Sequence, residues 1–172
     1  MFGGIVFYVV PVETAYLMND LGIESSGLIG MVTAIASAAT ITGSVVFASM
    51  VGRPERRLFA IFLLCGIGFV MIGLAQNVAV LLLGAFVNCI GTGLLLPTLL
   101  TWAMSGLRYA NRGRGTGLWT ASFFLGQFLC PLVMIGLKSV TADLATAVSI
   151  VGLASTAVAL GTLPLLRRGA SS

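Results

Sequence analysis

The sequence predicts an all-α polytopic membrane protein in which six transmembrane helices form one bundle. Of its 172 residues, 58% are apolar and only 8% are charged, whereas an ordinary soluble domain has about 25% charged residues. The mean hydropathy is +1.10, so the side chains suit lipid better than water. Apolar runs of bilayer length alternate with short polar breaks, which is the pattern of a chain that crosses a membrane repeatedly.

The six apolar runs are expected to be helices, because a backbone inside hydrocarbon must satisfy its own hydrogen bonds. They are too long and too uniformly apolar for the alternating strands of a barrel. The chain is predicted to be a single bundle over residues 1–172 with spans at 1–18, 25–50, 58–75, 78–100, 117–136 and 144–166.

The first span begins at the first residues with no flanking Lys or Arg, and its 18 residues reach only roughly 27 Å. We therefore expect a fragment or half of a longer protein. Glu13 lies in this span on one helical face with Tyr16. An intramembrane carboxylate indicates function by default, but Glu13 lies in the outer third and could equally sit in an external vestibule or at the interface.

The second and sixth spans each carry a stripe of small residues that predicts close helix packing. The third, fourth and fifth spans each contain one cysteine, without a metal or redox spacing, so we interpret all three as small core residues. The stripes are Ala34, Ala38, Ala39 and Gly43, and Ala145, Ser149, Gly152, Thr156 and Ala159; the cysteines are Cys65, Cys89 and Cys130.

The fourth span places Asn88 and Thr92 on one face with two glycines. Such a stripe can line an aqueous path or bond to a neighbouring helix, and both interpretations stay open. Pro97 is expected to end the regular helix, because its ring displaces the preceding turn and frees a carbonyl. The segment 98–107 is then expected to lie laterally or at the interface.

The fifth span gives the best arrangement of polar and aromatic side chains. Thr116, Thr120, Phe124, Gln127 and Pro131 follow one another at helical spacing, so one face presents hydroxyls, an aromatic ring, an amide and a kink. A drug-like or sugar-like ligand favours this mixture of apolar wall and few hydrogen bonds. The alternative is that the glutamine bridges two helices.

The polar breaks alternate in charge, which predicts the topology. Eight of the nine basic residues fall on one side of the six-span order, and the positive-inside rule makes that side the cytoplasm. The chain is therefore expected to be a multi-pass protein of the cell (inner or plasma) membrane with its C-terminus in the cytoplasm. The basic residues expected to serve cytoplasmic topology or gating are Arg53, Arg56, Arg57, Arg112 and Arg114.

Composition argues against enzymes and nucleic-acid binding. The chain has no histidine and five acidic residues, which removes histidine-dependent nucleophilic catalysis and leaves little for a carboxylate or metal site. No cofactor and no metal are expected. The arginines between apolar spans are explained by topology, so no nucleic-acid partner is expected either.

Three runs resemble the C-terminal six-helix half of the major facilitator superfamily. RGRGTGLW at 112–119, followed by FFLGQF at 123–128 and by Pro131, resembles the start of that family's eleventh helix. GTGLLLP at 91–97 resembles the end of the tenth, and GIESSGL at 22–28 resembles the loop between the seventh and eighth.

The resemblance implies a secondary transporter that works by alternating access between two six-helix bundles. It implies Tyr8, Glu13, Tyr16, Asn88 and Gln127 as residues at the cavity or its rim, to which the stripes above add Thr92 and Thr120. Glu13 is then the candidate for proton coupling, and efflux of a small neutral or cationic organic solute is the expected activity.

The expected partners are lipid, the solute, and either an N-terminal six-helix half or a second copy of this chain. The alternative function is a six-span membrane scaffold that does not transport, or a homodimeric half-transporter.

Overall fold

The computed structural model describes residues 1–50, 54–141 and 143–162, and only the backbone of 54–56. Within these ranges all of the regular secondary structure is helical, which confirms the all-α prediction. Five helices are long and apolar enough to cross a membrane, and the third contributes a shorter apolar helix, Arg57–Gly73. The elements are α1 (Phe2–Asp20), α2 (Ser26–Ser49), α3 (Pro54–Gly73), α4 (Val78–Ser105), the 3-10 turn η1 (Tyr109–Asn111), α5 (Arg112–Thr141) and α6 (Leu144–Gly161).

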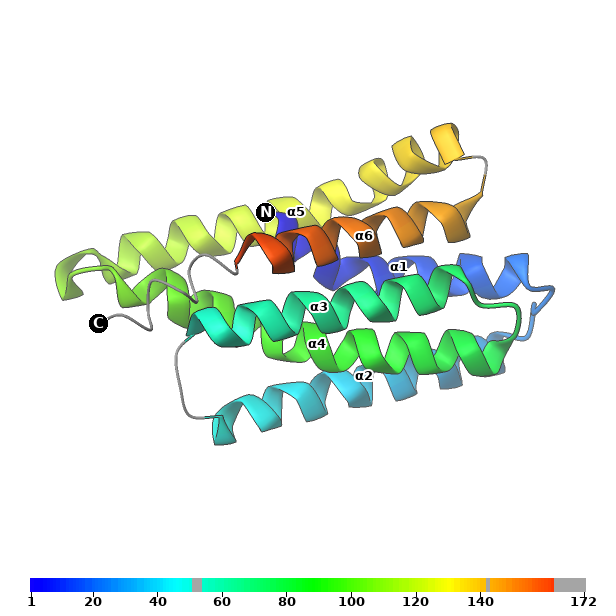
Figure 1. Cartoon of the computed structure of the whole chain (residues 1–172), viewed down its shortest axis with the longest axis horizontal. Coiled ribbons are helices and arrows are strands. Elements are labelled where there is room, and N and C mark those ends of the chain that lie inside the picture. The colour runs from blue at the N-terminus through cyan, green and yellow to red at the C-terminus, as the bar shows by residue number, and fades with distance from the viewer. Residues whose placement is uncertain (51–53, 142, 163–172) are drawn as a thin grey trace.

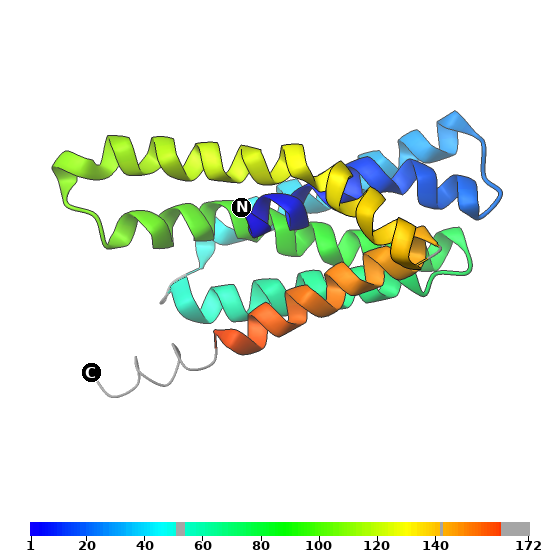
Figure 2. The same ribbon diagram turned by 90° about the horizontal axis from the view of Figure 1, so that it is seen from above.

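Successive helices run in alternating directions, so α1, α3 and α5 share one direction and α2, α4 and α6 the other (Figure 1). Helix α3 packs most extensively against α4 and α6, α2 packs against α4, and α1 packs against α5. The last turns of α4 and the first turns of α5 extend together beyond the other helices (Figures 1 and 2). The bundle therefore consists of a closely packed group of four helices with the α1–α5 pair beside it.

The small-residue stripe of the sixth span is confirmed as a packing surface. Gly66 of α3 lies so close to Gly152 and Thr156 that a Cβ there would collide with both. Gly73 lies equally close to Ser149. Small residues on both helices let the backbones approach, which supplies the packing that holds helices together in lipid.

The stripe of the second span is only half a packing surface. Ala39 and Gly43 are buried, and a Cβ on Gly43 would meet the carbonyl of Ile90 in α4. Ala34 and Ala38 are exposed. Successive residues of a helix point about 100° apart, so the side of α2 that carries Ala34 and Ala38 is turned away from α4.

The prediction that the regular helix ends at Pro97 is wrong, since α4 continues to Ser105. Proline lacks an N–H, so the carbonyl of Gly93 loses the donor that would normally come from residue 97. The hydroxyl of Ser44 in α2 donates to this carbonyl at 3.0 Å. A polar group that would otherwise be left unpaired in hydrocarbon is thereby satisfied, and the helix runs through the proline.

Helices α2, α4 and α6 begin at the end of the bundle where α1 ends, and each has a side-chain N-cap. Ser25, Asn77 and Asp143 accept hydrogen bonds from backbone amides of the first turns of α2, α4 and α6. Between α1 and α2, Gly22 has a φ of +78°, and the amide of Ile23 donates to the carbonyl of Met18. This is the Schellman arrangement, in which glycine supplies the left-handed residue.

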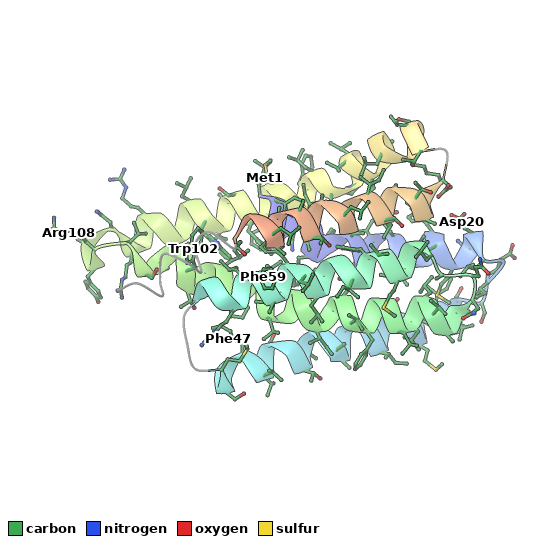
Figure 3. All side chains as sticks on the ribbon, viewed as in Figure 1. Met1, Asp20, Phe47, Phe59, Trp102 and Arg108 are labelled. Carbon is green, nitrogen blue, oxygen red and sulfur yellow. The ribbon has the colours of Figure 1, made fainter. Side chains whose placement is uncertain are left out.

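The hydrophobic core draws on all six helices, and its largest fully buried side chains include Phe69 of α3 and Met18 of α1. Cys65, Cys89 and Cys130 are all buried and free, which confirms their interpretation as core residues. Figure 3 places Asp20 and Arg108 at opposite ends of the bundle, so the acidic α1–α2 connection and the basic α4–α5 connection lie at different ends.

Candidate functional site

The candidate site is a groove of about 470 Å³ between α1 and α5. Its walls are mostly apolar and aromatic, with a phenol and an amide as the polar side chains. The lining residues are Tyr8, Phe124, Gln127, Phe128, Pro131 and Leu132. A few polar groups in an apolar wall are the usual composition of a small-molecule site.

Two glycines bring the walls of this groove together. A Cβ on Gly4 of α1 would collide with the carbonyl of Phe123, and one on Gly126 of α5 would collide with the carbonyl of Met1. The Phe7 ring then meets the Phe123 ring edge to face at 5.8 Å, and Trp119 stacks on Phe123 at 5.2 Å. This aromatic cluster fixes α1 on α5 beside the groove.

Tyr8 and Gln127 are the two predicted cavity residues that the structure brings together in the groove. The sequence spacing placed Gln127 on one face with Phe124 and Pro131, and all three line the groove. Thr120 is half-buried outside this lining set.

Glu13 and Tyr16 lie further along α1 and differ sharply in burial. Glu13 is only 6% exposed, whereas Tyr16 is 60% exposed. Glu13 lies near Lys138 and Cys130 of α5, and the five residues that separate it from Tyr8 amount to about 7.5 Å along the helix. Its carboxylate therefore belongs to the α1–α5 interface near the groove rather than to the groove lining.

Asn88 and Thr92 lie inside the four-helix group. Asn88 has 0% exposure and donates from its side-chain amide to the carbonyl of Cys65 in α3 at 3.0 Å. Thr92 is buried and donates to the carbonyl of Cys89 in its own helix at 3.2 Å. Of the two interpretations of this stripe, Asn88 therefore follows the second, a hydrogen bond to a neighbouring helix.

The basic residues lie away from the groove. Arg112 and Arg114 are exposed at the start of α5, where Arg112 lies over the Tyr109 ring at 5.9 Å. The guanidinium of Arg57 donates to the carbonyl of Met50 and lies 5.3 Å from the centre of the Phe47 ring. Arg53 and the side chain of Arg56 are outside the described residues.

Phe128 and Leu132 are lining residues that were not predicted from the sequence. Both follow Phe124 at intervals of four, so they extend its helical face, and this regular spacing is the signal that could have identified them. All three are more than half exposed, which makes one flank of α5 an apolar surface.

The Major Facilitator Superfamily profile matches residues 1–169 of the chain. The chain therefore belongs to the major facilitator superfamily, a family of multi-pass membrane transporters. A comparison with curated proteins gives no match.

Proposed function

We propose that this chain is the C-terminal six-helix half of a secondary transporter that moves a small organic solute by alternating access. The groove between α1 and α5 is the single observation that carries this proposal. It combines the rings of Phe124 and Phe128 with the amide of Gln127 and the phenol of Tyr8, and none of the described residues that line it is charged. Membership of a transporter family supports the same activity.

The partner in this proposal is a second six-helix bundle, either an N-terminal half or another copy of this chain. Phe124 and Phe128 are 60% and 72% exposed on the groove side of α5. Alternating access needs two bundles that enclose the solute between them, and this aromatic flank suits the role of one wall.

Glu13 is the residue that we propose for proton coupling. A buried carboxylate in a membrane helix is costly unless it titrates, pairs or reaches water. Glu13 is buried, and it lies near Lys138 in the last turn of α5. Efflux is the proposed direction, since it suits amphiphilic solutes that partition into the bilayer.

The proposed orientation has the arginine-rich end in the cytoplasm of the cell. Arg108, Arg112 and Arg114 lie at the α4–α5 end, opposite Asp20. Basic residues between spans favour the cytoplasmic side. The C-terminal residues 163–172 lie outside the described residues, and their cytoplasmic location is part of the proposal.

The test uses the complete transporter in vesicles and a fluorescent cation, hydroxyethyl-dimethyl-(naphthylmethyl)ammonium, whose permanent charge prevents passive accumulation. We expect Glu13→Gln to abolish uptake driven by a pH gradient while cation exchange without a gradient persists. Gln127→Ala is expected to raise the half-saturation concentration about tenfold, because it removes one hydrogen bond to the solute in a desolvated site.

The matched control is Leu153→Ala, because Leu153 lies on α6, is exposed and does not belong to the groove lining. It should leave uptake unchanged. A membrane scaffold would be indifferent to Glu13→Gln and Gln127→Ala at equal membrane levels, and that result would overturn the proposed function.

A further inference from the structure

We propose that the α1–α5 groove selects aromatic amphiphiles that carry an O–H or N–H donor, because Pro131 leaves the backbone carbonyl of Gln127 available to accept it. This inference rests on the proposed function for its biological meaning. It concerns binding, however, and can be tested without transport.

Pro131 interrupts the hydrogen bonding of α5 because of the covalent structure of proline. In a regular helix the carbonyl of residue 127 accepts from the amide of residue 131, and Pro131 has no amide hydrogen. The carbonyl lies between Gln127 and Pro131 along the helix. Both of these residues line the groove, so the acceptor lies on the groove side of α5.

Helix α4 contains a second carbonyl that a proline leaves without its helical donor, and this one lies in the packed core. Pro97 frees the carbonyl of Gly93 in the same way, and Ser44 of α2 donates to it at 3.0 Å. Within the described part of the chain, no side chain from another helix donates to the Gln127 carbonyl. The two prolines are thus chemically alike, and their carbonyls differ in whether a side chain supplies the missing donor.

The rest of the groove fits a donor-bearing aromatic molecule. Phe124 and Phe128 offer ring faces and edges, and Leu132 extends the apolar wall. None of the described residues that line the groove is basic, so the lining offers no partner for an anion. A cationic or uncharged ligand with one aromatic portion and one hydroxyl or amine group complements these features.

The test compares two probes that differ by one hydrogen-bond donor. One is the hydroxyethyl-dimethyl-(naphthylmethyl)ammonium cation, and the other is its methoxyethyl ether, which has the same ring and charge. Binding to the purified full chain is measured by fluorescence titration in detergent. We expect the alcohol to bind about fivefold more tightly than the ether, as one hydrogen bond predicts.

Pro131→Ala restores the amide hydrogen that bonds to the Gln127 carbonyl, so the alcohol and the ether should then bind about equally. Pro131→Val supplies the same amide hydrogen with a larger side chain and should give the same result. Pro97→Ala is the matched control, because the carbonyl it affects is already bonded to Ser44. It should keep the fivefold preference.

Circular dichroism and size-exclusion profiles establish that each variant is folded before its affinity ratio is compared. An unchanged ratio in both folded Pro131 variants would overturn the inference, as would a wild-type protein that binds neither probe or does not distinguish them. A preference for the alcohol in a protein that fails the transport test keeps this inference and rejects the proposed function. Transport without the preference does the opposite.

Discussion

Gly22 is the residue whose backbone conformation most restricts what the sequence can contain. Its φ of +78° lies in the left-handed region, and a Cβ there would meet nothing within 4 Å. Gly22→Ala should therefore destabilise the fold by about 1 kcal/mol through backbone strain alone. Thermal unfolding of the purified chain measures this change.

The control for Gly22→Ala is Gly106→Ala. Gly106 also has open space around its Cβ position, but its φ is −88°. Its substitution should leave the unfolding temperature unchanged. Equal losses at the two positions would show that the sign of φ is not the cause.

Asp143 is a cap whose strength depends on pH. The backbone amide of Thr146 donates to one carboxylate oxygen and the Thr146 hydroxyl donates to the other, and these bonds lower the pKa of Asp143 below its ordinary value of 3.8. A depressed pKa in the folded state means that the cap stabilises the start of α6 above pH 3.8 and loses this effect as the pH falls through the lower folded pKa.

Amide hydrogen exchange at Thr146, followed across this pH range and corrected for intrinsic exchange, measures the loss of protection. In Asp143→Asn the amide still caps the helix, but it does not titrate. Protection that is independent of pH in the native protein would contradict the assignment.

The residues of the groove could be predicted from the sequence only where they share one helix. The spacing of Phe124, Gln127 and Pro131 within one helix is enough to place them on one wall of the groove. Tyr8 joins them only because Gly4 and Gly126 bring α1 against α5, which is a contact between residues more than a hundred positions apart. For Asn88, periodicity alone could not decide between a cavity and the carbonyl of Cys65.

At the scale of single elements, the continuity of α4 depends on Ser44. Ser44→Ala removes the donor to the Gly93 carbonyl and should destabilise the fold by about 1 kcal/mol. In a Pro97→Ala background the helix supplies its own amide hydrogen, so Ser44→Ala should cost much less. A double-mutant cycle on unfolding free energies measures this coupling.

The single hydroxyl hydrogen of Ser44 is shared between the carbonyl of Gly93 and that of Thr40 within α2. Ser44→Ala removes the share that goes to Thr40 in both backgrounds, so the coupling energy reports chiefly the bond to Gly93. Additive effects of the two substitutions would mean that Ser44 does not compensate for the proline.

The same contact explains why the end of α4 was predicted wrongly. Local sequence rules correctly state that Pro97 frees a carbonyl. The compensating donor is 49 positions away in sequence and becomes a neighbour only after α2 packs on α4. By contrast, the existence and order of the helices follow from local hydropathy, which needs no knowledge of tertiary contacts.

At the scale of the whole molecule, the opposite ends of the bundle should be accessible from opposite sides of the membrane. Glu24 lies in the α1–α2 turn and Asn111 lies in the α4–α5 connection. Variants with one added cysteine, Glu24→Cys and Asn111→Cys, should react with an impermeant maleimide from outside and from inside the cell, respectively.

The three natural cysteines are buried, so the unmodified chain provides the background for this labelling experiment. Glu24→Cys and Asn111→Cys variants that label from the same side would contradict the alternating path of the six helices. Labelling from opposite sides in the reverse sense would keep the fold and overturn the proposed orientation.

The division of the bundle into an α1–α5 pair and a group of four other helices has a mechanical consequence. Glycines bring the backbone of α1 close to α5, that of α2 close to α4, and that of α3 close to both α4 and α6. Every residue that lines the groove comes from α1 or α5. Any shift of this pair against its neighbours would therefore carry both walls of the groove together, without separating the side chains that line it.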